Sequence, residues 1–132
     1  MTQYRDTKDF SQAELASLFS SVAWESARFP ERLVRAMKGF QTIFSAWEGD
    51  RLLGLIAVLD DGEMTAYIHY LLVRPEAQRR GIGSALLAMA LEKYRTYPRI
   101  VLHAEGGAAP FYEKFGFTGM DALPMLRRGT SL

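Results

Sequence analysis

The chain has 132 residues, of which 48% are hydrophobic and 23% are charged, and its formal net charge is +1. This length fits one domain with one core, and this composition is typical of a folded globular protein; a second domain of ordinary size and a disordered chain are both excluded. The adjacent arginines are Arg79-Arg80 and Arg127-Arg128. Such a weak positive charge gives no electrostatic support for binding long nucleic acid or an anionic membrane.

The sequence contains no cysteine. Disulfides, thiolate nucleophiles and cysteine metal sites are therefore excluded. The first six residues lack the apolar core of a signal peptide, and no apolar run approaches the length of a membrane-spanning helix. We therefore expect a cytoplasmic protein.

The first third of the sequence predicts a short strand at Tyr4 followed by two helices. Ser11 and Glu14 have the spacing of a capping box, in which each side chain satisfies a free backbone amide. Apolar residues then follow at helical spacing: Leu15, Leu18, Phe19 and Val22. A second helix is expected to open at Pro30, because proline is favoured at the first helical position, and to end at Gly39.

The middle of the sequence predicts an antiparallel meander. Residues 42–47 and 52–59 are apolar, β-branched or aromatic, and they flank Glu48-Gly49-Asp50, which is a hairpin signal. Asp60-Asp61-Gly62 marks another turn, and residues 66–73 form the next predicted strand.

The second half of the sequence alternates between strand and helix patterns. Pro75 ends the meander, and a broad apolar helix face follows Gly83. A short buried strand is expected at residues 100–102 and a short helix at residues 108–115. One or two last strands are expected from Phe117 onward, with Pro124 restricting one of them to a sheet edge. The mixed order predicts an α/β (α+β) three-layer domain.

The strongest local signal runs from Gln78 to Gly83, between a predicted strand and a predicted helix. Helix N-termini bind anions, and the glycines at 81 and 83 allow the backbone to approach a phosphate closely. A glycine-containing loop that simply starts a helix is the alternative, since a lone G-x-G is a weak motif. Two other phosphate motifs fit poorly, because Leu86 stands at the third glycine position of G-x-G-x-x-G and no Gly-Lys-Ser/Thr is present.

Two segments together resemble one enzyme superfamily. Residues 71–87, LLVRPEAQRRGIGSALL, resemble the acetyl-CoA motif of the GNAT superfamily of N-acetyltransferases, and residues 111–117, FYEKFGF, resemble its second signature. The resemblance implies one GNAT acetyltransferase domain over residues 1–132, built as a mixed central sheet with helices on both faces. It also places the chain among small bacterial members, because Ser21-Val22-Ala23-Trp24 is similar to that branch.

The resemblance further implies how acetyl-CoA binds. Pantetheine would lie where the strand ending at Val73 and the strand at 99–104 splay apart, paired with the backbone much as an added strand would be. An amide near Leu72 would stabilise the oxyanion, the turn after Gln78 would hold the pyrophosphate, and no metal is needed. The implied cofactor-binding residues are Leu71, Leu72, Val73, Gln78, Arg79, Arg80, Gly81, Ile82, Gly83, Ser84 and Glu105.

Three residues are catalytic candidates. Tyr112 matches the tyrosine that GNAT enzymes use as general acid toward the CoA thiolate, although the aromatic residues around it also suit a packed helix–strand junction. His69 matches a histidine that arylalkylamine N-acetyltransferases use as a base through water, and Tyr67 stands beside it where other members carry an acid or a histidine. Strand alternation predicts that residues 67, 69 and 71 share one face. A histidine that satisfies a local hydrogen bond is the alternative for His69.

The acceptor site is predicted from aromatic residues, namely Trp24, Phe29 and Tyr70, with Trp47 assigned to the core. The related branch usually has Gln-Asp where this chain has His69-Tyr70, so an acceptor cannot be borrowed from it. We expect direct transfer of acetyl to a small primary amine in a ternary complex. A protein N-terminus or lysine as acceptor, or a non-catalytic acyl-CoA-binding module, are the alternatives. A homodimer is compatible with the superfamily.

Overall fold

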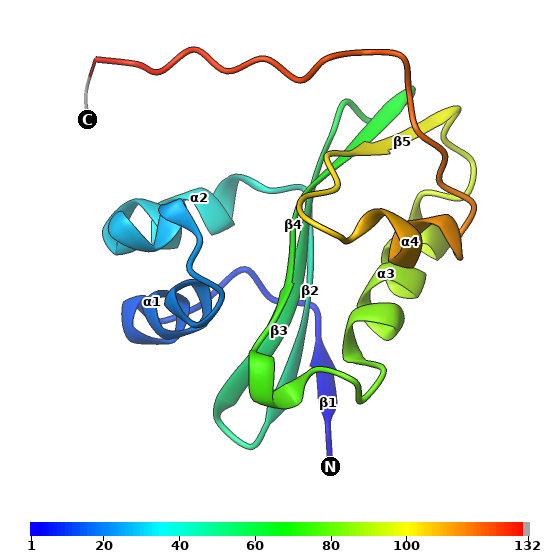
Figure 1. Ribbon diagram of the computed structural model, residues 1–132. Helices are drawn as coiled ribbons and strands as arrows, with labels where there is room; N and C mark the ends of the chain where they lie inside the picture. Colours follow the sequence, from blue (N-terminus) through cyan, green and yellow to red (C-terminus); the bar gives the residue numbers. More distant parts are fainter. Residues whose placement is uncertain (131–132) are drawn as a thin grey trace. The chain divides into compact units, whose positions relative to one another are not determined.

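The computed structural model describes residues 1–130. The chain forms two compact units, Met1–Val101 and Leu102–Leu132, each of which is considered by itself. Figure 1 shows the first unit as a sheet with α1 and α2 on one face and α3 on the other. No helix in the described part of the chain is long and apolar enough to cross a membrane.

The sheet has five strands in the order of the sequence: β1 (Gln3–Arg5), β2 (Thr42–Glu48), β3 (Arg51–Asp60), β4 (Thr65–Val73) and β5 (Arg99–Leu102). The first four strands pair antiparallel. The predicted meander is therefore confirmed to within a residue or two of each boundary. Its turns form where the sequence places a glycine with positive φ, at Gly49 and Gly62.

The two N-terminal helices, α1 (Gln12–Ser21) and α2 (Pro30–Gly39), begin where the sequence predicts. The capping box is present, because the Glu14 amide donates to Ser11 Oγ at 3.1 Å and the Ser11 amide donates to Glu14 Oε1 at 2.9 Å. A 3₁₀ helix, η1 (Glu25–Arg28), separates α1 from α2.

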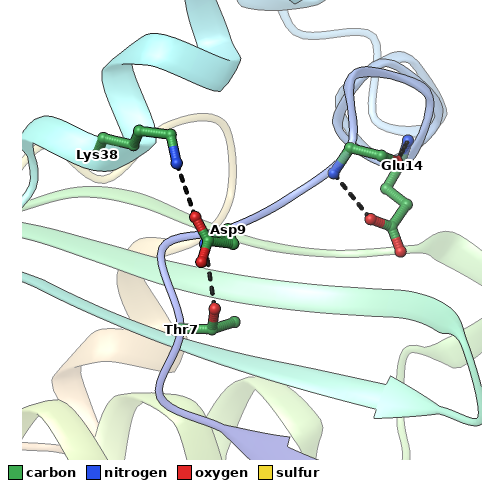
Figure 2. Close-up of polar contacts among 5 residues, drawn as sticks. Thr7, Asp9, Glu14 and Lys38 are labelled. Atoms are coloured by element: carbon green, nitrogen blue, oxygen red, sulfur yellow. Dashed lines mark hydrogen bonds and ion pairs between the residues drawn. The ribbon is translucent and has the colours of Figure 1, made fainter.

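An ion pair ties α2 to the segment before α1. Lys38 Nζ donates to Asp9 Oδ1 at 2.7 Å, and Asp9 in turn donates its amide to Thr7 Oγ1 at 3.0 Å (Figure 2). The hydrogen bond from Lys38 is the largest cause that lowers the pKa of Asp9, and the lysine charge adds to it. Both side chains are exposed, so this contact fixes geometry more than it stabilises the fold.

Two apolar layers enclose the sheet. The layer toward α1 and α2 contains Leu15, Leu18, Phe19, Met37, Ile43, Leu55, Ala57 and Leu72, all at most 4% exposed. The opposite layer includes the buried side of α3 (Ile82–Lys93), formed by Ile82, Leu86, Leu87 and Ala90. A short 3₁₀ turn, η2 (Pro75–Ala77), joins β4 to α3. The predicted α/β fold with helices on both faces is confirmed for this unit.

The second unit contains one short helix, α4 (Ala109–Glu113), which is shorter than the 108–115 expected. The last strand or strands expected from Phe117 onward are wrong, because the described residues 114–130 form no strand. Apolar side chains in this stretch are exposed: Met120, Leu123, Met125 and Leu126. Gly116 takes a φ of 90°, and Pro124 has no amide to donate, so this backbone is poorly suited to continuous strand pairing.

Candidate functional site

The loop between β4 and α3 presents unpaired amides at a helix N-terminus. Gly81 caps the 12-residue helix α3 with φ 79°, and no side chain caps it. The first hydrogen bond of the helix runs from the Ala85 amide to the Gly81 carbonyl at 3.0 Å. The amides of residues 82–84 precede that bond and therefore have no partner within the helix. With the helix dipole behind them, they suit an anion such as a phosphate.

The arginines around this loop differ in their partners. Arg80 Nη2 donates to Glu48 Oε2 at 2.9 Å and to Thr2 Oγ1 at 3.4 Å, so its charge is already paired across to β2. Arg79 is exposed and takes a φ of 66°, which is uncommon for a residue other than glycine. Such backbone strain is typical of functional loops.

The side chain of Gln78 turns toward the end of β4. Its Nε2 donates to the carbonyl oxygen of Val73 at 3.0 Å and closes the loop over η2. Arg74 reaches back to β3, where its amide donates to the Leu53 carbonyl at 2.8 Å and its Nε donates to the Leu52 carbonyl at 2.6 Å. Burial lowers the pKa of this arginine. Together these contacts hold the end of β4 in one position.

The end of β4 extends past its outer neighbour β5. The Arg99 amide, at the start of β5, donates to the carbonyl of Met64, one residue before β4 begins, at 3.1 Å. The two strands therefore start at the same end of the sheet and run parallel. Because β5 has four residues and β4 has nine, β5 runs beside the first half of β4 only. Residues 71–73, the predicted pantetheine-binding backbone, lie in the second half.

A β-bulge lies at His69. Ala57 pairs with Tyr70 and Val58 pairs with Ile68, so His69 is the extra residue between two pairs. Bulges of this kind are over-represented next to active sites, where they redirect a side chain. His69 is exposed, and its ring centroid lies 4.3 Å from that of Tyr70, 5.4 Å from that of Tyr67 and 5.9 Å from that of Phe40.

The bulge changes which residues share a face. Strict alternation predicts Tyr67, His69 and Leu71 on one face, and this prediction is wrong for Leu71. Leu71 pairs with Ile56, whose two neighbours on β3 belong to the layer under α1 and α2. Leu71 therefore faces the opposite side. Tyr70, in place of Leu71, lies on the same face as His69 and packs against the α1–α2 layer.

The predicted acceptor residues are only partly brought together. Trp24 lies with its ring centroid 5.9 Å from that of Tyr70, on the side of the sheet that carries α1 and α2. Phe29 stands at the N-cap of α2, where the guanidinium of Arg28 lies 5.6 Å from its ring centroid. Trp47 is 3% exposed and stacks on Phe10, so its assignment to the core is confirmed.

The second unit carries Tyr112 and Glu105. Tyr112 is half-buried on α4, and its ring centroid lies 5.1 Å from that of Phe111 and 5.8 Å from that of Phe117. Burial raises the pKa of the Tyr112 phenol above its usual value, and the negative charge of Glu105 raises it further. A phenol in this state keeps its proton and can donate it.

Two residues at this site were not found by sequence reasoning. Ser26 is hydrogen-bonded to Tyr70 at 3.0 Å, and Glu48 is paired with Arg80. Each partner lies more than thirty residues away in the sequence. Ser26 lies in η1 and Glu48 ends β2, and neither residue type carries a local signal of such a distant contact, so only the fold could reveal it.

Known proteins resemble this chain over most of its length. Serotonin N-acetyltransferase of Mesocricetus auratus is 39% identical over 79 residues, which cover 57% of this chain and 38% of the relative. An uncharacterized ycf52-like N-acetyltransferase of Prochlorococcus marinus is 31% identical over 111 residues, which cover 80% of this chain and 61% of the relative. The chain thus spans less than two thirds of either curated relative.

Solved structures and a family model agree with these relatives. A GNAT family acetyltransferase from Streptococcus pneumoniae TIGR4 superimposes with a TM-score of 0.84 and 27% identity, covering 98% of both chains. The model of the acetyltransferase (GNAT) domain matches residues 6–131. With its α/β fold and its loop of free amides before α3, this chain belongs to the GNAT acetyltransferase family.

Proposed function

We propose that this acetyltransferase moves acetyl from acetyl-CoA to the primary amine of a small molecule. The observation that carries the proposal is the continuity of two features: β4 extends past β5, and the loop that follows it presents the three amides of residues 82–84. The backbone of a strand suits the amides of pantetheine, and a helix N-terminus suits the pyrophosphate. Both relatives named above are N-acetyltransferases, which supports nitrogen as the acceptor atom.

Different residues of the first unit would bind different parts of acetyl-CoA. The backbone of Leu71, Leu72 and Val73 would pair with pantetheine, with the Leu72 region polarising the thioester carbonyl. The turn from Arg79 to Ser84 would hold the phosphates. Gln78 and Arg80 belong to the same proposed cofactor site, and their hydrogen bonds to Val73 and Glu48 also hold the loop in shape. The fit of the loop to phosphate rests on its free amides and on the charge of Arg79.

The chemistry needs one proton removed and one supplied. Acetyl-CoA supplies an activated acyl group; a C–N bond to the amine forms and the C–S bond breaks. His69, which is exposed on its bulge, would accept the proton of the amine directly or through water, with Tyr67 beside it. Tyr112 would return a proton to the leaving sulfur, and burial keeps its phenol protonated at neutral pH. Glu105 would contact pantetheine.

Four further assignments belong to this proposal. Trp24, Phe29 and Tyr70 are assigned to the acceptor side. The chain acts as one acetyltransferase domain over residues 1–132, in the cytoplasm, and a homodimer is compatible with it. A protein N-terminus or lysine would change only the acceptor. A non-catalytic acyl-CoA-binding module would keep cofactor binding and lose transfer.

A panel of amines tests the proposal. Arylalkylamines, polyamines, amino acids and peptides are offered with acetyl-CoA, CoA thiol release is the readout, and mass spectrometry identifies the acetylated product. We expect release above the hydrolytic background with at least one small amine. Release with peptides alone would move the acceptor to proteins. Binding of acetyl-CoA by calorimetry without release for any amine would support the non-catalytic module and contradict the transferase.

A further inference from the structure

Tyr70 joins β4 to the N-terminal segment that covers the sheet. Its hydroxyl and Ser26 Oγ are 3.0 Å apart, and Ser26 lies in η1, 44 residues earlier in the chain. Its ring also contacts three aromatic residues of that segment, with centroid distances of 5.0 Å to Phe19, 5.8 Å to Phe40 and 5.9 Å to Trp24. One side chain on β4 thus touches α1, η1 and the residue that follows α2.

The 3₁₀ helix is not part of the buried core. None of its four residues is buried, and no side chain caps its N-terminus. Ala27 is only partly buried against the core. The hydrogen bond between Ser26 and Tyr70 links η1 directly to the strand beneath it.

This link lies directly beside the proposed base. The rings of Tyr70 and His69 are 4.3 Å apart, because the bulge places two consecutive side chains on the same side of β4. Any shift of η1 relative to Tyr70 therefore changes the surroundings of the amine that His69 would deprotonate.

The surface around this link is aromatic. Tyr67 and His69 stand next to each other on β4 with ring centroids 5.4 Å apart, and neither is buried. Stacked or edge-on contact with such rings favours a flat aromatic group over a saturated one of the same size. A protonated amine attached to that group also gains from the faces of the tyrosines.

We propose that the Ser26–Tyr70 contact determines the acceptor, by holding η1 as one wall of an acceptor site that takes a primary amine carried on an aromatic group. Ser26 and Tyr70 are positioning residues, which act through the placement of η1 and take no part in proton transfer. This assignment rests on the proposed function, because it names the substrate class of the same site.

The test compares two amines that differ only in aromaticity, 2-phenylethylamine and 2-cyclohexylethylamine. We expect the wild-type protein to have the higher kcat/KM for the aromatic amine. Tyr70→Phe and Ser26→Ala each remove one partner of the hydrogen bond, and each should raise KM for the aromatic amine about three- to tenfold, the range expected for one lost hydrogen bond. The Kd of acetyl-CoA should not change. The KM of the double variant for the aromatic amine should be no higher than that of either single variant, because the two substitutions remove the same contact.

Controls separate a specific role from a structural one. Ser26→Thr keeps a hydroxyl and should retain the wild-type KM. Tyr4→Phe removes a phenol from an exposed tyrosine on β1 and should leave both amines unaffected. Thermal melting shows whether each variant folds. If Ser26→Ala does not fold, the KM values of Tyr70→Phe and Ser26→Thr for the aromatic amine are compared instead.

The outcomes distinguish this assignment from the proposed function. If amines are acetylated but the variants change KM equally for the aromatic and the saturated amine, the specificity assignment is overturned. It is also overturned if the effects of the two single variants on KM add up in the double variant. In both cases the proposed transferase activity is unaffected. If acetyl-CoA binds but no amine of the wider panel is acetylated, the proposed function fails and this assignment fails with it.

Discussion

Gly54 and Leu72 approach each other so closely that a Cβ on residue 54 would lie 2.7 Å from the carbonyl oxygen of Leu72. Real Cβ atoms essentially never come that close to a backbone oxygen. The glycine on β3 therefore sets the position of the β4 backbone proposed to bind pantetheine. The same Cβ would also lie 3.2 Å from Val73 Cα, so the two strands would have to separate.

Gly54→Ala should accordingly destabilise the fold by about 1–3 kcal/mol, the usual cost of overpacking a core. It should also weaken acetyl-CoA binding, because the strand edge that binds the cofactor moves. Urea unfolding and calorimetry measure the two effects. Gly39→Ala is the matched control, since a Cβ there meets no atom within 4 Å and α2 gains a better helix former. Equal unfolding midpoints for Gly54→Ala and wild type would contradict the argument.

Gly83→Trp should abolish acetyl-CoA binding while the protein remains folded. An indole at residue 83 would stand beside the amides of residues 82–84 that are proposed to bind phosphate, and because Gly83 is only half-buried we expect the fold to survive the change. Calorimetric titration with acetyl-CoA measures the loss. Ala88→Trp places the same side chain at an exposed position farther along the helix and should bind normally. A folded Gly83→Trp protein with wild-type affinity would remove the phosphate assignment.

Tyr112→Phe should lower turnover much more than it lowers acetyl-CoA affinity, because only the proton donor is lost. Since burial and Glu105 raise the pKa of this phenol, its deprotonation should not produce a falling limb in the pH–rate profile below about pH 10. Single-turnover kinetics measure the rate of acetyl transfer, and calorimetry measures the affinity for acetyl-CoA. Unchanged turnover under conditions in which chemistry is rate-limiting would exclude Tyr112 as the acid.

Tyr94 provides a prediction about stability. Its hydroxyl donates to Asp60 Oδ2 at 2.6 Å and lies 2.5 Å from Oγ1 of Thr42, which is 2% exposed. Burial raises the pKa of Tyr94, and the hydrogen bond to Asp60 raises it further. The folded state thus prefers the neutral phenol. Its stabilisation is fully present below the pKa of an unfolded tyrosine, near 10, and is lost as pH rises through the folded value.

Tyr94→Phe should therefore destabilise the protein by about 1–3 kcal/mol at neutral pH, because the buried Thr42 hydroxyl loses a partner. Urea midpoints measured from pH 7 to pH 10.5 should fall more steeply for wild type than for the variant. Adding Thr42→Val should recover part of the loss, since both partners are then apolar. Parallel pH dependences for the two proteins would show that Tyr94 does not contribute in this way.

Most element boundaries could be predicted because the sequence marks them chemically. Ser11 with Glu14 starts α1, Pro30 starts α2 and Gly49 marks the first hairpin turn. Each of these signals acts through its own backbone, so no knowledge of the fold was needed.

Features that depend on a distant partner could not be predicted. The bulge at His69 arises from pairing with Ala57 and Val58, and nothing in the sequence of β4 itself interrupts the alternation. The expected strands after Phe117 failed for the related reason that the local sequence does not specify a neighbouring strand to pair with. The ion pair of Arg80 with Glu48 and the contact of Tyr70 with Ser26 belong to the same class.

The bulge has a consequence for how such a protein diverges. His69 has no opposite residue on β3, so replacing it leaves every cross-strand pair of the sheet unchanged. The loop before α3 and the end of β4 lie several residues farther along and are fixed by their own contacts. A substitution at residue 69 can therefore change the surroundings of the proposed acceptor site while the strand register and the loop proposed to bind the acetyl donor stay in place.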